Sequence, residues 1–306
     1  MKYTKNPLSF DEQADQLIER GLKGDRDTII KRLRDVNYYR LSAYWYPYRN
    51  PDNTLSEGAS FEIIWDRYVF DRQLRLLVMD AIERVEISIR TRMTNLLTLK
   101  ADDAFVHLNP NELSERVKAE ERERFLNGIR RNTKRSREAF VQHFREKYGD
   151  CHDDLPLWMA VEVMTFGDML TLFKMMDMHS QREVAAIYGV SAKVLKSWLM
   201  TLNYVRNLCA HHARLWNREF AVRPTIPAQK RHPDWHDPEI SSHRIFATLS
   251  LLYFMLKKVA PQSGWADRLE CLLNRHPDIP LDDMGFIVDW KRHPLWDASE
   301  STKEPK

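Results

Sequence analysis

Arginine, asparagine and histidine side chains in the segment 206–211 are the residue types that cleavage of RNA requires. An imidazole exchanges a proton near neutral pH, so His211 can take the proton of a ribose 2′-hydroxyl or supply one to the leaving 5′-oxygen. The Arg206 guanidinium can offset the charge that develops on the phosphate, and the Asn207 amide can orient the phosphate or the imidazole. This chemistry uses no metal and no cofactor, and we expect neither.

One helix is expected to carry this segment, capped by Ser191 and running to about Arg218. At about 100° per residue, a single polar stripe forms on this helix. The stripe contains Asn203, Arg206, Asn207, His211, Arg214 and Arg218. Arg206 and His211 lie about 140° apart around the helix axis, so within one copy they could contact a phosphate only from opposite sides of that phosphate. Two chains related by a twofold axis could present both groups together.

Three other residues of this region have weaker functional interpretations. Arg214 and Arg218 are candidate RNA-binding residues because they extend the polar stripe. His212 falls toward the apolar side of the helix, which indicates a structural or orienting role. A lone arginine and histidine at this spacing occur often by chance, so the spacing alone is weak evidence.

The helices that must position this segment follow from apolar spacing and caps. Short helices are expected at 11–22 and 27–39, and a long helix capped by Ser60 is expected to reach about residue 100. Further helices are expected at 155–177, 183–187 and 243–259. Glu86 and Glu162 lie on two of these helices; each could orient the arginine or the histidine, or serve as an ordinary ion-pair partner.

Two other segments could contact RNA. The aromatic block 38–46 could stack on bases, although packing of this part onto the main body is the simpler use. The highly charged segment 112–147 contains a basic cluster that could bind phosphates, although most such runs are solvated helix surfaces. The members of this basic cluster are Arg130, Arg131, Lys134, Arg135 and Arg137.

Composition favours helices throughout. Only 9 of 306 residues are glycine, which leaves few turns for a sandwich or barrel, and no strand is expected. The net charge of +3 is too small to indicate a nucleic-acid partner by itself. Three cysteines far apart form neither a disulfide framework nor a metal knuckle. With no signal-peptide core and no apolar run long enough to span a bilayer, a cytoplasmic protein without membrane contact is expected.

Three parts are predicted along the chain. Residues 1–58 form a small N-terminal helical and aromatic module, and residues 59–260 form the helical core with the charged insertion at about 112–150. Residues 261–306 form a C-terminal segment, whose last residues from 299 onward are expected to be a disordered tail.

A different function remains open for residues 183–198. Small residues precede Gly189, and Ser191 can cap a second helix. This pattern is typical of a helix-turn-helix in DNA-binding regulators. The second helix would offer only Lys193 and Lys196 to DNA. A scaffold that binds RNA without cutting it is a third interpretation.

The string 206–218, RNLCAHHARLWNR, resembles the signature of the Abi-like (AbiD/AbiF-type abortive-infection) family, a branch of the HEPN superfamily. Three further blocks resemble the family in the same order. These blocks are NYYRLS at 37–42, AIERVE at 81–86, and LPLW at 155–158 leading to Glu162. Together the four blocks span most of residues 1–220.

The resemblance implies an all-α, HEPN-type helical bundle with a metal-independent ribonuclease motif. The arginine and histidine of that motif fall on Arg206 and His211, with Asn207 as the polar residue after the arginine. It also implies a homodimer whose two motifs form one composite site, and a role in defence against bacteriophage. Some relatives act with a non-coding RNA, so RNA, and in some cases a dedicated non-coding RNA, is the expected partner.

Overall fold

Helices are the only regular elements in the part of the chain that the structure describes. The computed structural model describes residues 2, 4, 6–236 and 238–297, which contain three isolated β-bridges and no strand. The predicted all-α class is confirmed. The α-helices are α1 (Phe10–Glu19), α2 (Arg26–Asp35), α3 (Tyr38–Trp45), α4 (Phe61–Ala101), α5 (Ala119–Arg135), α6 (Ala139–Tyr148), α7 (Leu157–Val163), α8 (Phe166–Met175), α9 (Met178–Ile187), α10 (Ala192–Ala210), α11 (Ile245–Val259) and α12 (Trp265–Arg275).

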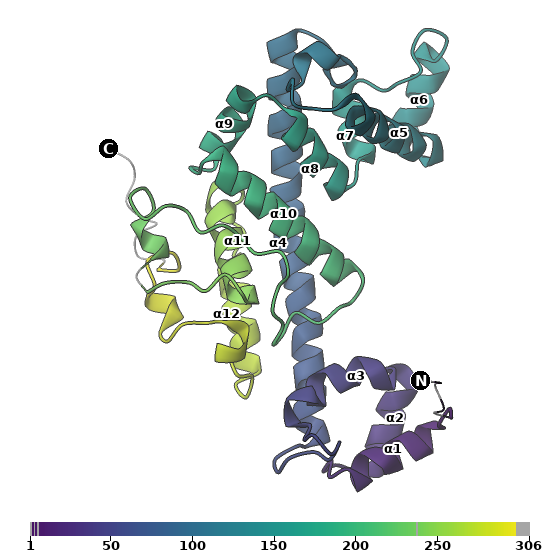
Figure 1. The fold of residues 1–306 in the computed structure, drawn as a ribbon, viewed down its shortest axis with the longest axis vertical. Coiled ribbons are helices and arrows are strands. Elements are labelled where there is room, and N and C mark those ends of the chain that lie inside the picture. The colour runs from purple at the N-terminus through teal and green to yellow at the C-terminus, as the bar shows by residue number, and fades with distance from the viewer. Residues whose placement is uncertain (1, 3, 5, 237, 298–306) are drawn as a thin grey trace.

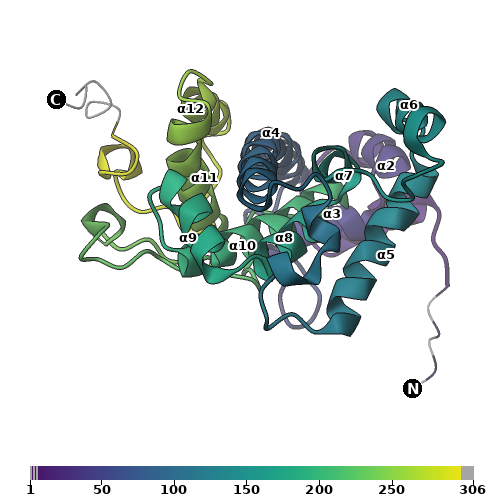
Figure 2. The same cartoon turned by 90° about the horizontal axis from the view of Figure 1, so that it is seen from above.

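The helix α4 is the axis of the molecule. It begins where predicted, with the Ser60 hydroxyl accepting from the Ile63 amide at 3.3 Å, and its 41 residues extend over about 60 Å. Figure 1 shows the N-terminal helices at one end of α4 and α5 to α7 near the other. Figure 2 looks nearly along α4, with α11 and α12 on one side and α7 on the other.

The N-terminal module contains one more helix than predicted. The expected helix at 27–39 is interrupted: α2 ends at Asp35, and a separate helix, α3, begins directly after Asn37. The Asn37 side chain accepts from the Tyr39 amide at 2.8 Å and so caps α3. The helix α3 packs against α4 through Leu41, Tyr44 and Trp45, which are buried.

The predicted helix at 155–177 is also two helices. It breaks at Met164, and Thr165 then caps α8 in a reciprocal capping box with Asp168. Arg90 of α4 lies at the break, where its guanidinium donates to the Met164 carbonyl at 2.8 Å and to the Val161 carbonyl. Both carbonyls lie at the end of α7, where the Val161 carbonyl also accepts from the Met164 amide at 3.3 Å, so Arg90 adds to the hydrogen bonding of this helix end.

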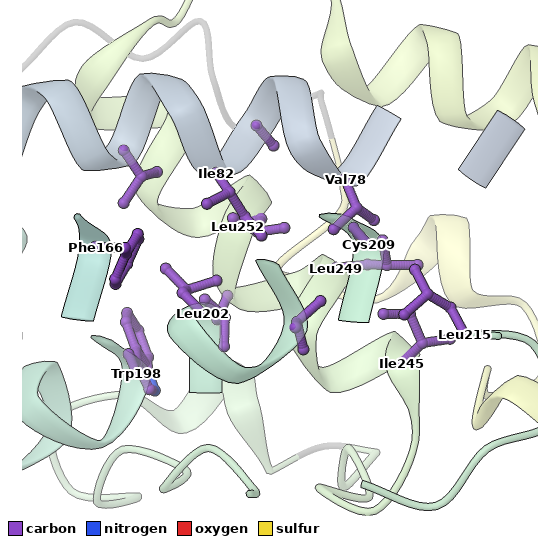
Figure 3. Close-up of a cluster of buried hydrophobic side chains, with 14 of the residues drawn as sticks. Val78, Ile82, Phe166, Trp198, Leu202, Cys209, Leu215, Ile245, Leu249 and Leu252 are labelled. Carbon is purple, nitrogen blue, oxygen red and sulfur yellow. The ribbon is translucent and has the colours of Figure 1, made fainter. Parts of the chain in front are cut away.

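The core that positions α10 includes side chains of α4, α8 and α11. Val78 and Ile82 of α4, Leu202 of α10 and Leu249 of α11 meet in one buried cluster, shown in Figure 3. The predicted buried helix at 243–259 is confirmed as α11, ten of whose fifteen residues are buried, so it is covered on nearly all sides. These contacts fix the apolar face of α10 against α4.

The C-terminal segment joins the same body. Trp265 of α12 donates its indole N–H to the Leu77 carbonyl of α4 at 2.9 Å. The tail predicted from residue 299 lies outside the described residues. None of the described helices is long and apolar enough to cross a membrane.

Candidate functional site

The helix that carries Arg206 is shorter than predicted. Ser191 caps it as expected, accepting from the Val194 amide at 3.3 Å, but α10 ends at Ala210 and not near residue 218. The polar stripe therefore ends at His211. Arg214 and Arg218 follow in an irregular segment and are not part of the stripe. The prediction that they lie on the same helix as Arg206 is therefore wrong.

A left-handed residue ends α10. His212 has φ 57°, and the amides of His212 and Ala213 donate back to the carbonyls of Cys209 and Leu208 at 2.9 and 2.8 Å. This pair of hydrogen bonds is the Schellman pattern that commonly closes a helix. The Arg40 guanidinium of α3 donates to the His212 carbonyl at 2.6 Å, so a cation lies at the negative end of the helix.

A single buried carboxylate fixes the chain after this turn. Asp71 of α4 has no exposed surface, and one of its oxygens accepts from the amides of Leu215 and Trp216 at 3.0 and 2.8 Å. Its other oxygen accepts from the Tyr44 hydroxyl at 2.6 Å and from the Arg75 guanidinium. Burial raises the pKa of Asp71, while Arg75 and these donors stabilise its charged form.

Aromatic packing reinforces this anchor. The buried Trp216 ring stacks on Tyr44 at 6.2 Å between centroids, and the Arg67 guanidinium lies 4.7 Å from the same indole. Arg214 donates to the Ala43 carbonyl of α3, and burial lowers its pKa. Arg214 thus ties this segment to the N-terminal module, whereas Arg218 remains partly exposed beyond it.

The three predicted catalytic residues lie at the open end of α10. Arg206 is partly buried and its Nη1 lies 3.4 Å from the Asn207 side-chain oxygen. His211 is exposed, and its ring has no hydrogen-bond partner among the described residues. Arg206 likewise has no carboxylate partner in that part of the chain. Neither side chain is held in an ion pair with another described residue.

Thiol chemistry is not favoured beside them. Cys209 faces the core, and burial raises the pKa of its thiol to about 12, so the thiol stays protonated at neutral pH. No group of three or more histidine, cysteine, aspartate or glutamate side chains is arranged to hold a metal ion within the described residues.

The two acidic candidates make no hydrogen bond to the motif. Glu86 pairs with Arg90, the arginine that holds the break between α7 and α8. Glu162 is exposed on α7 and has no ion-pair partner within the described ranges. The structure therefore places Glu86 in a structural ion pair and gives Glu162 no contact with Arg206 or His211.

The basic cluster forms the end of α5 and the link to α6. Arg130 is engaged by Asp154 at 2.7 Å and lies 3.7 Å from Glu123. The remaining four side chains are exposed and have no ion pair in the described part of the chain. They are Arg131, Lys134, Arg135 and Arg137. The cluster therefore contains one arginine that is ion-paired within the described chain and four cations that are not.

The helix-turn-helix interpretation has a mixed outcome. The helices α9 and α10 do flank a turn at Gly189, and Lys193 and Lys196 are exposed. Trp198 and Leu199, however, are fully buried, so the second helix is committed to the core beyond its first turns.

Sequence reasoning missed the residues that hold the motif in place. Arg40, Tyr44 and Asp71 come from α3 and α4, more than 130 positions before the turn that they contact. The sequence shows these residues but does not distinguish them, because an aspartate or arginine on a long helix usually belongs to a solvated face.

Asp71→Asn is expected to destabilise the chain by about 3–5 kcal/mol, because it leaves the Arg75 charge buried without its partner. Tyr44→Phe, which removes one hydrogen bond to the same carboxylate, should cost about 1.5–3 kcal/mol. Urea unfolding measures both values, and amide exchange of residues 211–217 should accelerate in the Asp71 variant. Equal stability of the Asp71 variant and the parent chain would contradict the role of Asp71 as an anchor.

The adjacent histidines provide a matched pair for the turn itself. His212→Gly should preserve stability or raise it by up to about 1 kcal/mol, because glycine adopts positive φ without the cost that an L-residue pays. His211→Gly, at φ −89°, should instead lose about 0.5–1 kcal/mol. A loss for His212→Gly as large as that for His211→Gly would show that the left-handed turn is not populated.

Comparison with known proteins supports the resemblance seen in the motif blocks. The family model described as Abi-like protein matches residues 31–217, well over half of the chain. The match begins in α2 and ends just after Trp216, so it includes α4, α10 and the segment anchored by Asp71. Neither a curated protein nor a solved structure matches the chain. The chain belongs to the Abi-like protein family.

Proposed function

We propose that this protein is a metal-independent endoribonuclease of a bacterial abortive-infection system, of the HEPN type. Membership in the Abi-like family supports a role in abortive infection. The observation that carries the chemistry is the end of α10, where Arg206, Asn207 and an unpartnered, exposed His211 lie within one and a half turns.

The reaction follows from these groups. His211 takes the proton of a ribose 2′-hydroxyl, the 2′-oxygen forms a bond to the adjacent phosphorus, and the bond from phosphorus to the 5′-oxygen breaks. The leaving 5′-oxygen receives a proton from a protonated imidazole or from water. Arg206 stabilises the added negative charge by paired hydrogen bonds, and Asn207 positions the guanidinium that it contacts. The products are a 2′,3′-cyclic phosphate and a 5′-hydroxyl.

Two copies of the chain complete the site. His211 follows Arg206 by five residues, so their side chains leave α10 about 140° apart. A twofold axis near the end of α10 brings the Arg206 of one copy to the same phosphate as the His211 of the other. The exposure of His211 supports this arrangement, because the ring faces solvent and not the body of its own chain.

RNA backbone binds at the exposed cations of α5 and its link to α6. Arg131, Lys134, Arg135 and Arg137 have no ion pairs within the described residues, in contrast to Arg130. The same surface favours the alternative function, a scaffold that holds a non-coding RNA without cutting it. Binding of RNA that is undiminished by removal of the His211 imidazole, with no cleavage by the parent chain, would select that alternative.

Arg206→Ala and His211→Ala are each expected to abolish RNA cleavage, with a loss of about 10²- to 10⁴-fold or more, because each removes a group that acts on the reacting phosphate. Gel analysis of a labelled RNA measures the loss, and the 5′ fragments of the parent reaction should end in a cyclic phosphate. Chelators should leave the rate unchanged.

His212→Gly is the matched control, since it keeps the turn and removes the neighbouring imidazole. It should cleave RNA at close to the parent rate. Full activity of the His211 variant, or inactivity of the His212 variant alone, would move the proton transfer to a different side chain and overturn the assignment.

The salt dependence of RNA binding tests the proposed role of the cations at the end of α5 and in its link to α6. Replacing Arg131, Lys134, Arg135 and Arg137 with glutamine should weaken RNA binding, and the slope of log K against log salt should fall by roughly 0.7 for each single-strand phosphate that the variant no longer neutralises. Arg130→Gln, whose cation is held by Asp154, should leave the slope nearly unchanged. Identical slopes for the fourfold variant and the parent chain would show that this surface does not bind RNA.

A further inference from the structure

Two tyrosines, Tyr39 of α3 and Tyr46 directly after its end, have their rings in solvent. Tyr39 is 72 % exposed and Tyr46 is 66 % exposed, although the other aromatic residues of the block 38–46 are buried or half-buried against the body. Burial of Tyr44 and Trp45 accounts for the packing of this module. Tyr39 adds only an edge contact with Tyr38, at 5.9 Å between ring centroids, and most of its surface stays exposed.

We propose that Tyr39 and Tyr46 form a stacking surface for the unpaired bases of single-stranded RNA. This inference rests on the proposed function and names how that RNA is held next to its site of cleavage. Every base has a flat apolar face, so exposed aromatic rings bind single strands with little regard to sequence.

Helical geometry places the two side chains on the same side, because the backbone at Tyr46 is still in the helical region. They are seven residues apart, which is about two helical turns and about 10 Å along the axis. Stacked bases follow each other at about 3.4 Å, so the two rings are too far apart to hold the same base. Each tyrosine therefore takes a base of its own from an extended strand.

This surface adjoins the candidate catalytic end of α10. Arg40, the residue after Tyr39, donates to the His212 carbonyl at 2.6 Å. Arg214 reaches the carbonyl of Ala43, which lies between the two tyrosines along the same side of the helix. A strand stacked on α3 thus passes close to the turn at His212 that ends α10.

The charge around the rings fits a nucleic acid and not an apolar protein surface. Residues 38–48 contain no acidic side chain, and the exposed residues among 38–47 are the two tyrosines, Arg40 and Pro47. No exposed aliphatic residue accompanies the rings there, whereas the exposed Arg40 supplies a cation for the phosphates between the stacked bases.

The test measures binding of a fluorescent single-stranded RNA to the full chain carrying His211→Ala, so that the RNA stays intact. In this parent, Tyr39→Ala and Tyr46→Ala should each weaken binding about tenfold, and Tyr39→Phe should restore it because the ring remains. Phe10→Ala removes another exposed ring of the same module, on α1, and should have no effect.

A fully paired duplex of the same sequence separates stacking from backbone contact. Its binding should be insensitive to both tyrosine substitutions, since its bases are not available. Unchanged binding of the single strand by the tyrosine variants, or equal weakening for single strand and duplex, would overturn the stacking surface and leave the proposed function standing. Failure of the parent chain to bind any RNA would overturn the proposed function, and the stacking surface with it.

Discussion

The buried carboxylate of Asp71 is the constraint on which the candidate site depends. It joins α3 through Tyr44, α4 through Arg75, and the segment after α10 through the amides of Leu215 and Trp216. A buried ion pair of this kind contributes little net stability compared with apolar packing, but removal of one member is costly. Its value here is geometric. It requires the chain to leave the helix at His212, and the turn at His212 leaves His211 at the exposed end of α10.

That geometry explains why the candidate site is exposed, and it supports the proposal that a second copy completes it. The core cluster of α4, α8, α10 and α11 fixes the apolar face of α10 (Figure 3), and Arg206 is left partly buried. His211 emerges about 140° further round the axis and faces solvent, where a second copy or a phosphate can reach it. The helix α3 lies beside the turn that ends α10, because Arg40 and Arg214 make hydrogen bonds between them. One anchored turn thus brings the N-terminal module, the catalytic candidates and the proposed RNA path together.

The elements could be predicted from the sequence wherever local chemistry determines them. Scarce glycine, the Ser60 and Ser191 caps and the apolar run of α11 each indicated what the structure contains. The end of α10 could not be predicted, because the sequence 206–218 has no glycine or proline to stop a helix. A histidine adopts the left-handed conformation there, at a cost of about 1–2 kcal/mol, because Asp71 holds the next residues from a distant point in the chain. The breaks at Asn37 and Met164 were missed for a similar reason, since side-chain caps and Arg90 supply the partners that continuing helices would have supplied.

Arg206 of one copy and His211 of another are proposed to act on the same phosphate, and mixing two inactive variants tests this arrangement most directly. Arg206→Ala and His211→Ala chains are unfolded together, refolded and assayed for RNA cleavage, with light scattering to establish that mixed dimers form. Random pairing makes about half of the dimers mixed. A mixed dimer has two Arg206–His211 pairs between its copies, one with both residues intact and one with both replaced. A shared site therefore predicts recovery of about one quarter of the parent activity. Mixed dimers that form and show no recovery would contradict the claim, as would full cleavage by a chain that remains monomeric.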